Sequence, residues 1–192
     1  HEEHEEHEEH EEHEEHEESH HHHGADPHAW LDPENASIWL DVIASELSKL
    51  DPENASIYQQ NAELGKIEIA KVTQEVDEVL EQFRGTKFIV FHDAYQYFEY
   101  RFGLYADGAI LLSDSSDPTP SRIVKIRNKV AELEEVCVFS EPQFNPRLVT
   151  TVLNGSKART AVIDPLGAEI NLDKSFYINL LADLAKNIAS CK

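Results

Sequence analysis

Two histidines in the sequence stand beside residues that suit a metal site. His28 lies in Asp26-Pro-His28, and His92 directly follows the apolar run at 87–91. Imidazole suits zinc, copper and nickel, and two imidazoles with a carboxylate or a third histidine make a plausible zinc or manganese shell. Asp164 follows another apolar run and would supply a carboxylate. We therefore treat His28, His92 and Asp164 as candidate metal ligands.

Each candidate also has a purely structural interpretation. A histidine at a strand end often serves packing alone, a loop histidine is usually exposed, and an aspartate before a proline is a common turn residue. Glu141, at the end of a third apolar run, would cap the next helix or bind backbone amides. The sequence holds no nucleophile elbow, Walker loop, dinucleotide-binding glycine motif or His-Glu-x-x-His, so nothing supports nucleophilic catalysis.

The other ten of the 12 histidines lie in residues 1–23. Residues 1–18 are six His-Glu-Glu repeats and residues 20–23 are four histidines. This segment has no apolar residue, so nothing offsets the entropy cost of ordering it. We interpret residues 1–23 as a loose collector of metal ions, with a solvated low-complexity tail or part of a purification tag as the alternatives.

Composition excludes several classes of protein. The formal net charge is −22, and without the repeats 38 less 12 leaves 26 acidic residues against 16 basic ones, a charge of −10. Such a body has no basic stripe for nucleic acid, and no stretch approaches the 18 apolar residues of a membrane span. Cys137 and Cys191 are too far apart for a Cys-x-x-Cys motif, which leaves a disulfide or two free thiols open.

The pattern after residue 24 predicts an α/β fold with a four-stranded parallel sheet and flanking helices. Apolar periodicity predicts a helix over 33–49 and a long one over about 52–83, each starting within an octapeptide that occurs at 31–38 and 50–57. Continuous apolar strands separated by helices are typical of a parallel sheet covered on both faces, which binds ligands at the carboxyl ends of its strands. The predicted strands are 87–91, 109–112, 136–139 and 160–163, and the predicted helices are 94–102, one from 119, 145–153 and one from 175.

Four motifs in this order resemble the ZnuA-type substrate-binding proteins of zinc ABC transporters. They are Asp26-Pro-His-Ala-Trp-Leu-Asp-Pro-Glu34, Phe91-His-Asp-Ala-Tyr-Gln-Tyr-Phe98, Cys137-Val-Phe-Ser-Glu-Pro-Gln-Phe144 and Ile163-Asp-Pro-Leu-Gly167. The resemblance covers nearly the whole chain. The His/Glu run is similar to the His- and acid-rich loop that these proteins often carry just before the first motif.

The resemblance implies two lobes, each a small parallel sheet with helices, joined by one long helix, with metal in the cleft between them. It divides the chain into a His/Glu-rich metal-collecting loop at 1–23, the end of the N-terminal lobe at 24–52, the linking helix at 53–84 and the C-terminal metal-binding lobe at 85–192. Most of the N-terminal lobe, with one metal-binding histidine, is then absent, and we expect a fragment with half a cleft.

The resemblance also assigns roles to single residues. His28 and His92 match two of the three metal-binding histidines of the family. Asp164 matches a position that ligates metal in manganese-type relatives and supports the ligands in zinc-type members. Cys137 and Cys191 match a pair that is disulfide-bonded in the zinc branch.

The expected function is that of a high-affinity zinc receptor and not of an enzyme. It would capture Zn²⁺ as transported ligand in the periplasm or at the cell surface, lipid-anchored in a single-membrane organism, and deliver it as a monomer to an ABC permease. The alternatives are a manganese- or iron-type transport receptor or adhesin, a metal-dependent hydrolase using His28, His92 and Asp164 with Glu141 as base, and a His-rich metal buffer.

Overall fold

The core of the protein is a four-stranded, all-parallel sheet with strand order β2-β1-β3-β4. This computed structural model describes residues 26–112, 118–133 and 135–191, so the predicted metal-collecting loop at 1–23 lies outside the described residues. The α/β class and the parallel sheet predicted from the apolar runs are confirmed. The strands are β1 (Lys87–His92), β2 (Gly108–Leu111), β3 (Val136–Ser140) and β4 (Arg159–Val162).

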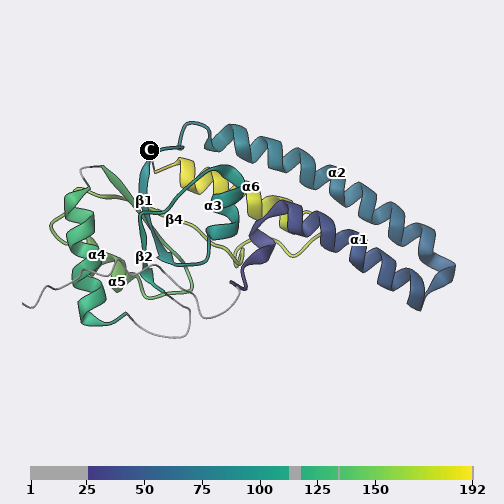
Figure 1. Cartoon of the computed structure of the whole chain (residues 1–192), viewed down its shortest axis with the longest axis horizontal. Coiled ribbons are helices and arrows are strands. Elements are labelled where there is room, and N and C mark those ends of the chain that lie inside the picture. Colours follow the sequence, from purple (N-terminus) through teal and green to yellow (C-terminus); the bar gives the residue numbers. More distant parts are fainter. Residues whose placement is uncertain (1–25, 113–117, 134, 192) are drawn as a thin grey trace, which may run out of the picture.

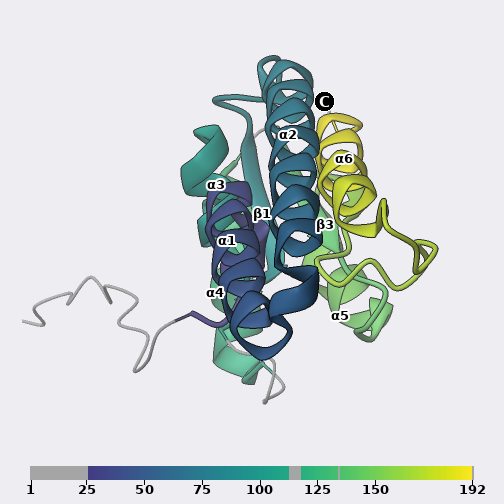
Figure 2. The same ribbon diagram turned by 90° about the vertical axis from the view of Figure 1, so that its right-hand side faces the viewer.

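Helices cover both faces of this sheet (Figures 1 and 2). Successive side chains of a strand point to opposite faces, so each continuous apolar strand contributes to two cores. Phe88 and Val90 of β1 pack in one cluster with residues of α2, α3 and α6. Ile89 and Phe91 pack in a second cluster with residues of α4 and α5. The helices are α2 (Ala55–Leu80), α3 (Gln96–Phe102), α4 (Pro120–Glu132), α5 (Pro146–Leu153) and α6 (Phe176–Ala189).

A long helical hairpin projects from the sheet domain (Figure 1). It consists of α1 (Pro33–Leu50), a short 3-10 helix η2 (Pro52–Asn54) and α2, which packs along α1 and then against α6. The predicted second helix therefore begins three residues later than expected, because residues 52–54 form a 3-10 turn. Among the described residues, no helix is both long enough and apolar enough to cross a membrane.

The repeated octapeptide starts both arms of this hairpin but lies in two different environments. In the first copy, Asp32 caps α1 by accepting from the Glu34 backbone N–H at 2.9 Å, and Leu31 is fully buried. In the second copy, Asp51 accepts instead from side chains of η2 and α2, and Leu50 is 82% exposed. The same octapeptide begins an α-helix at Pro33 and a 3-10 turn at Pro52 that leads into α2, and tertiary packing decides which leucine is buried.

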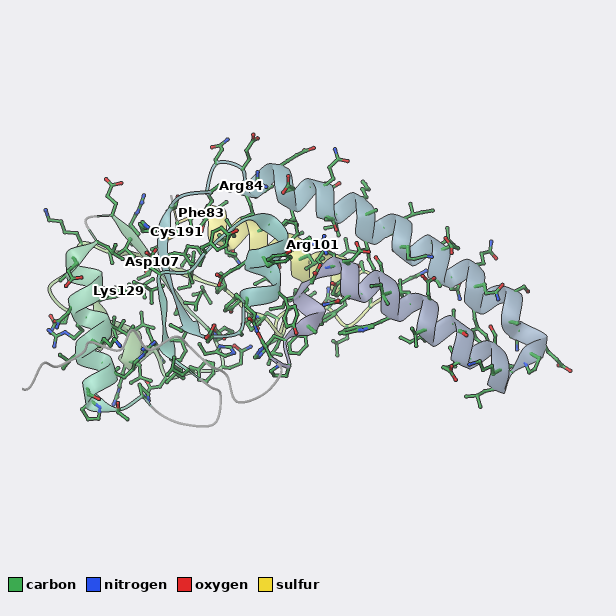
Figure 3. All side chains as sticks on the ribbon, viewed as in Figure 1. Phe83, Arg84, Arg101, Asp107, Lys129 and Cys191 are labelled. Atoms are coloured by element: carbon green, nitrogen blue, oxygen red, sulfur yellow. A yellow bond between two sulfur atoms is a disulfide. The ribbon has the colours of Figure 1, made fainter. Side chains whose placement is uncertain are left out.

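A disulfide ties the last helix to the centre of the sheet. Cys137 in β3 is bonded to Cys191, two residues beyond the end of α6, with 6.0 Å between their Cα atoms. Both residues are buried in the cluster that also contains Phe83, and Figure 3 labels Phe83 and Cys191. The bond that the family resemblance implied is therefore present.

One partly buried carboxyl group, that of Glu99, lies in α3, away from the disulfide. Glu99 accepts a hydrogen bond from the Ala106 backbone N–H at 2.8 Å and so fixes the chain between α3 and β2. Burial, helped by the negative charge of Asp93, raises the pKa of Glu99 from 4.5 to about 7, although the hydrogen bond opposes the shift.

We expect Glu99 to make the protein less stable as pH rises from about 4.5 to 7. The folded chain keeps this proton up to about pH 7, whereas the unfolded chain releases it near 4.5, so the folded state binds more protons in this window. The free energy of unfolding should fall by about 2–3 kcal/mol across it. Urea unfolding at pH 5 and pH 8 measures this, and Glu99→Gln should remove most of the difference.

Glu75→Gln is the matched control, because Glu75 lies on the exposed side of α2. This variant should keep the pH dependence of the original chain. The interpretation is wrong if Glu99→Gln loses as much stability between the two pH values as the original chain does.

Candidate metal centre

His92 lies at the point of the sheet where a ligand crevice is expected. β1 and β3 are neighbours in the sheet but not consecutive in the chain, so the segments that follow them lead away from each other. Open parallel sheets bind ligands at such a point, beyond the carboxyl ends of the strands. Ile89 is paired with Val138, and the same register three residues further on places His92 beside Glu141.

The imidazole of His92 is buried and held by that glutamate. Nδ1 of His92 lies 2.7 Å from Oε1 of Glu141, and the backbone N–H of His92 donates to the same oxygen at 3.4 Å. The rings of Phe144 and Tyr95 flank the imidazole at centroid distances of 5.3 and 6.1 Å. The ring is therefore fixed in position from several sides.

The ring of His28 is held in a similar way, by a carboxylate from a different part of the chain. It lies just before the 3-10 helix η1 (Ala29–Leu31), and its Nδ1 lies 2.6 Å from Oδ1 of Asp26. The same oxygen accepts from the His28 backbone N–H at 2.9 Å. In each histidine a carboxylate engages Nδ1, so Nε2 is the ring nitrogen that would bind a metal.

The structure brings the two predicted histidines together. Their ring centroids lie 5.3 Å apart and their planes are nearly perpendicular, at 67°. Two imidazoles that share one tetrahedral zinc through Zn–N bonds of about 2.0–2.1 Å have ring centroids about 5 Å apart. The pair is thus spaced for one shared ion.

Helix α3 anchors the segment that carries His28. Gln96 donates from Nε2 to Oδ2 of Asp26 at 2.6 Å. At the other end of the segment, Arg101 pairs with both carboxylate oxygens of Asp32, at 2.7 and 3.0 Å, and Figure 3 shows Arg101 near the start of α1. Because α3 follows β1 directly, these contacts hold His28 to the element that carries His92.

The opposite side of the same segment is held by the loop after β4 and by α6. The indole N–H of Trp30 donates to the Pro165 carbonyl at 3.0 Å. The hydroxyl of Tyr177 donates to the Trp30 carbonyl at 2.8 Å. The His28 segment therefore lies between α3 on one side and α6 on the other.

Asp164, the third candidate ligand, shapes the loop to which Trp30 binds. Its Oδ1 accepts from Nε2 of Gln143 at 2.5 Å and from the Leu166 backbone N–H at 2.9 Å, and its Oδ2 accepts from the Ala168 N–H at 2.6 Å. Gly167 in this turn has a φ of +66°, a conformation that favours glycine. Within the described residues, no three His, Cys, Asp or Glu side chains are grouped to hold a metal ion, so Asp164 does not complete such a group here.

Sequence reasoning missed the two carboxylates that bind the histidine rings. Glu141 was expected to cap a helix, bind backbone amides or act as a hydrolytic base, and it does accept from one backbone N–H, but its shorter contact is with the His92 ring. The register of β1 against β3 was the signal that would have revealed this contact. Asp26 was quoted only as part of a motif, although an aspartate two residues before a histidine is placed to accept from it.

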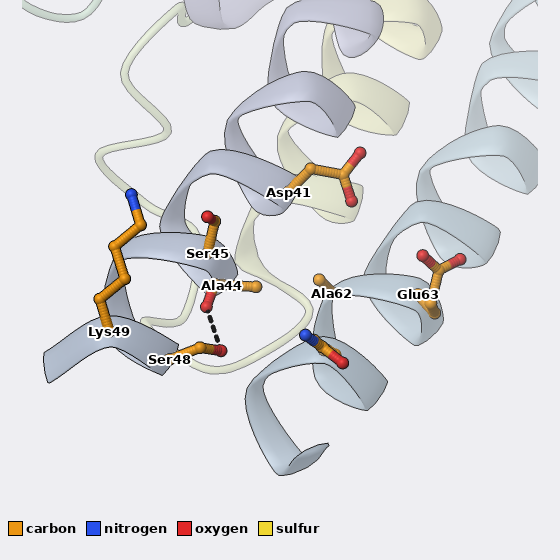
Figure 4. Close-up of a pocket in the computed structure, with 8 residues that line it drawn as sticks. Asp41, Ala44, Ser45, Ser48, Lys49, Ala62 and Glu63 are labelled. Atoms are coloured by element: carbon orange, nitrogen blue, oxygen red, sulfur yellow. Dashed lines mark hydrogen bonds between the residues drawn. The ribbon is translucent and has the colours of Figure 1, made fainter. Parts of the chain in front are cut away.

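A separate hollow lies far along the helical hairpin (Figure 4). It has a volume of about 430 Å³ between α1 and α2, and Ser48 at its wall donates to the Ala44 carbonyl at 2.7 Å. Its lining includes Asp41, Glu63 and Lys49 but no histidine or cysteine. This hollow does not have the chemistry of a zinc site.

Comparison with known proteins gives one consistent result. The family described as "Zinc-uptake complex component A periplasmic" (ZnuA) matches residues 1–191. The chain is 45% identical over 166 residues to the high-affinity zinc uptake system protein ZnuA of Brucella abortus, covering 86% of the chain and 50% of that protein. It is 41% identical over 169 residues to its counterpart in Paracoccus denitrificans, covering 88% of the chain and 52% of that protein.

Solved structures show the same fold. A crystal structure of ZnuA superimposes with a TM-score of 0.75 at 28% identity, covering 87% of the chain and 62% of that structure. A mutant of the laminin-binding adhesin Lmb from Streptococcus agalactiae superimposes with a TM-score of 0.73 at 29% identity, covering 87% of the chain and 63% of that structure. The chain spans about half the length of the curated relatives it matches.

Proposed function

The chain belongs to the ZnuA family of periplasmic zinc-uptake components, and from this premise we propose that it is the zinc-binding part of a receptor that delivers Zn²⁺ to an ABC permease. The receptor works in the periplasm or at the cell surface, where a lipid anchor would hold it in a single-membrane organism. It binds and releases its cargo as a monomer and carries out no reaction on it.

The observation that carries this proposal is the buried pair of His28 and His92 at the carboxyl edge of the sheet. Their ring centroids lie 5.3 Å apart. Two neutral imidazoles suit zinc, whereas manganese and magnesium prefer carboxylate, carbonyl and water oxygens. Asp26 and Glu141, each on the Nδ1 atom of one ring, hold the rings so that both Nε2 atoms stay available to a metal. The remaining ligands come from water or from parts of the receptor beyond this chain.

We assign Asp164 a supporting place at this site. Its carboxylate fixes the turn to which Trp30 binds, and Trp30 is two residues from His28. We assign residues 1–23 the collecting role, in which ten weakly binding histidines raise the zinc concentration near the specific pair.

Uptake of radioactive zinc by cells that lack their own zinc receptor tests the proposal. The intact parent protein should restore zinc uptake at low external zinc, and deletion of residues 1–23 should slow it. The double variant His28→Asn, His92→Asn should return uptake to the level of cells without a receptor. His10→Asn, which removes a single repeat histidine, is the matched control and should behave like the parent.

The same cells distinguish the alternatives. Restored manganese uptake without restored zinc uptake would identify a manganese-type receptor. Full zinc uptake by the double variant would exclude the pair as the specific site and favour a His-rich buffer.

A further inference from the structure

Glu141 is the most deeply buried carboxylate at the candidate metal centre, and its position has a chemical consequence for His92. The side chain of Glu141 is 1% exposed and that of His92 is 5% exposed. We propose that Glu141 is a positioning residue, which holds the proton of His92 on Nδ1 and so presents Nε2 to the metal. This inference rests on the proposed function, because it concerns how one of the proposed ligands is prepared.

The hydrogen bonds at Oε1 of Glu141 define which nitrogen carries the proton. The backbone N–H of His92 donates to this oxygen at 3.4 Å, so Oε1 acts as an acceptor. An ionised carboxylate can only accept, so opposite such a group the ring nitrogen Nδ1, 2.7 Å from the same oxygen, is the donor. A neutral imidazole that carries its proton on Nδ1 has its lone pair on Nε2, which is the atom that binds a metal in this geometry.

Because it is buried, the Glu141 carboxylate also affects the zinc affinity of the site. The other oxygen of Glu141, Oε2, is buried and has no hydrogen-bond partner of normal geometry within the described residues. A buried charge with few partners is costly, and a nearby cation lowers that cost. Zinc on Nε2 also draws electrons from the ring and strengthens the Nδ1–H donor, so Glu141 stabilises the loaded state more than the empty one.

Nitrogen NMR of the metal-free, full-length chain tests the tautomer directly. The His92 ring signals are identified as those missing from the spectrum of His92→Asn. We expect a proton on Nδ1 and none on Nε2 in the original chain. Glu141→Ala should shift the population toward the tautomer with its proton on Nε2, because the acceptor that favours Nδ1–H is removed. A proton on Nε2 in the original chain overturns the inference. This outcome is measured on the original chain alone and does not depend on whether a variant folds.

Zinc titration followed on the His92 ring signals tests the effect on affinity. Glu141→Gln keeps the shape of the side chain but removes its charge. We expect about 10- to 100-fold weaker zinc binding at His92, which is the usual effect of removing a hydrogen-bond partner of a metal-binding histidine. Glu99→Gln is the matched control, since it also replaces a partly buried glutamate with its amide but leaves His92 untouched, and it should keep both the tautomer and the affinity.

Failure of this inference and failure of the proposed function give different results. Unchanged zinc binding in Glu141→Gln overturns the positioning role while His92 remains a ligand. If zinc does not perturb the His92 ring signals in the original chain, His92 is not a ligand and the proposed function fails.

Discussion

Replacing His92 with asparagine is expected to lower the zinc affinity of the chain's specific site by at least about 100-fold, a cost of about 2.7 kcal/mol. Among the described residues His28 is the other histidine, and the rings lie 5.3 Å apart. Loss of one imidazole leaves a single nitrogen ligand at the site. Loss of a partner that merely orients a ligand already costs about 10–100-fold, so loss of the ligand itself should cost at least as much.

Competition with a zinc chelator of known affinity measures this effect. The comparison is made in a full-length variant whose ten histidines in residues 1–23 are replaced by glutamine. The measured zinc affinity then reports on residues 24–192. His92→Asn should then lose the tight site, while Glu99→Gln should keep it. Equal zinc affinity with and without the His92 imidazole would show that the specific site lies elsewhere.

The second large effect is expected from removal of the disulfide. Cys137 and Cys191 are 54 residues apart, so their bond closes a long loop in the unfolded chain. The chain-entropy model gives about 4 kcal/mol of stabilisation for a loop of this length. The double variant Cys137→Ala, Cys191→Ala should therefore lose about 4 kcal/mol in the free energy of unfolding, measured with urea at fixed pH.

A reducing agent supplies the matched control for this comparison. It should destabilise the original chain by a similar amount and leave the double variant unchanged, because that variant has no disulfide to lose. A difference below about 1 kcal/mol between oxidised chain and double variant would show that α6 is held to β3 by packing alone.

The fold could be predicted well from the sequence, because the apolar runs and the helix-start residues indicate the same strands and helices that the parallel sheet requires. The continuous apolar runs became β1 to β4 with ends shifted by about one residue, and the Asp-Pro and Thr-Pro pairs mark helix starts. The exception is the second octapeptide. Its sequence does not say that Leu50 stays exposed while Leu31 is buried, since burial depends on what the hairpin packs against.

The histidines of the candidate site could be predicted from the sequence, but their partners could not. His92 follows an apolar run, and the rule for parallel sheets places it at the ligand-binding edge. That Glu141 engages its ring depends on the order β2-β1-β3-β4, which places β3 beside β1. That Asp26 engages His28 depends on a turn that α3 and α6 hold from both sides. The role of Asp164 as a ligand stays a prediction, and its hydrogen bonds within its own loop were not visible in the sequence.

Diffraction at the zinc absorption edge from crystals of the zinc-loaded chain tests the central claim most directly. We predict an anomalous peak about 2.0–2.1 Å from Nε2 of both His28 and His92. Asp26 and Glu141 should remain on the two Nδ1 atoms. A strong zinc peak elsewhere in the body of the chain, with neither imidazole bound to metal, would contradict the account.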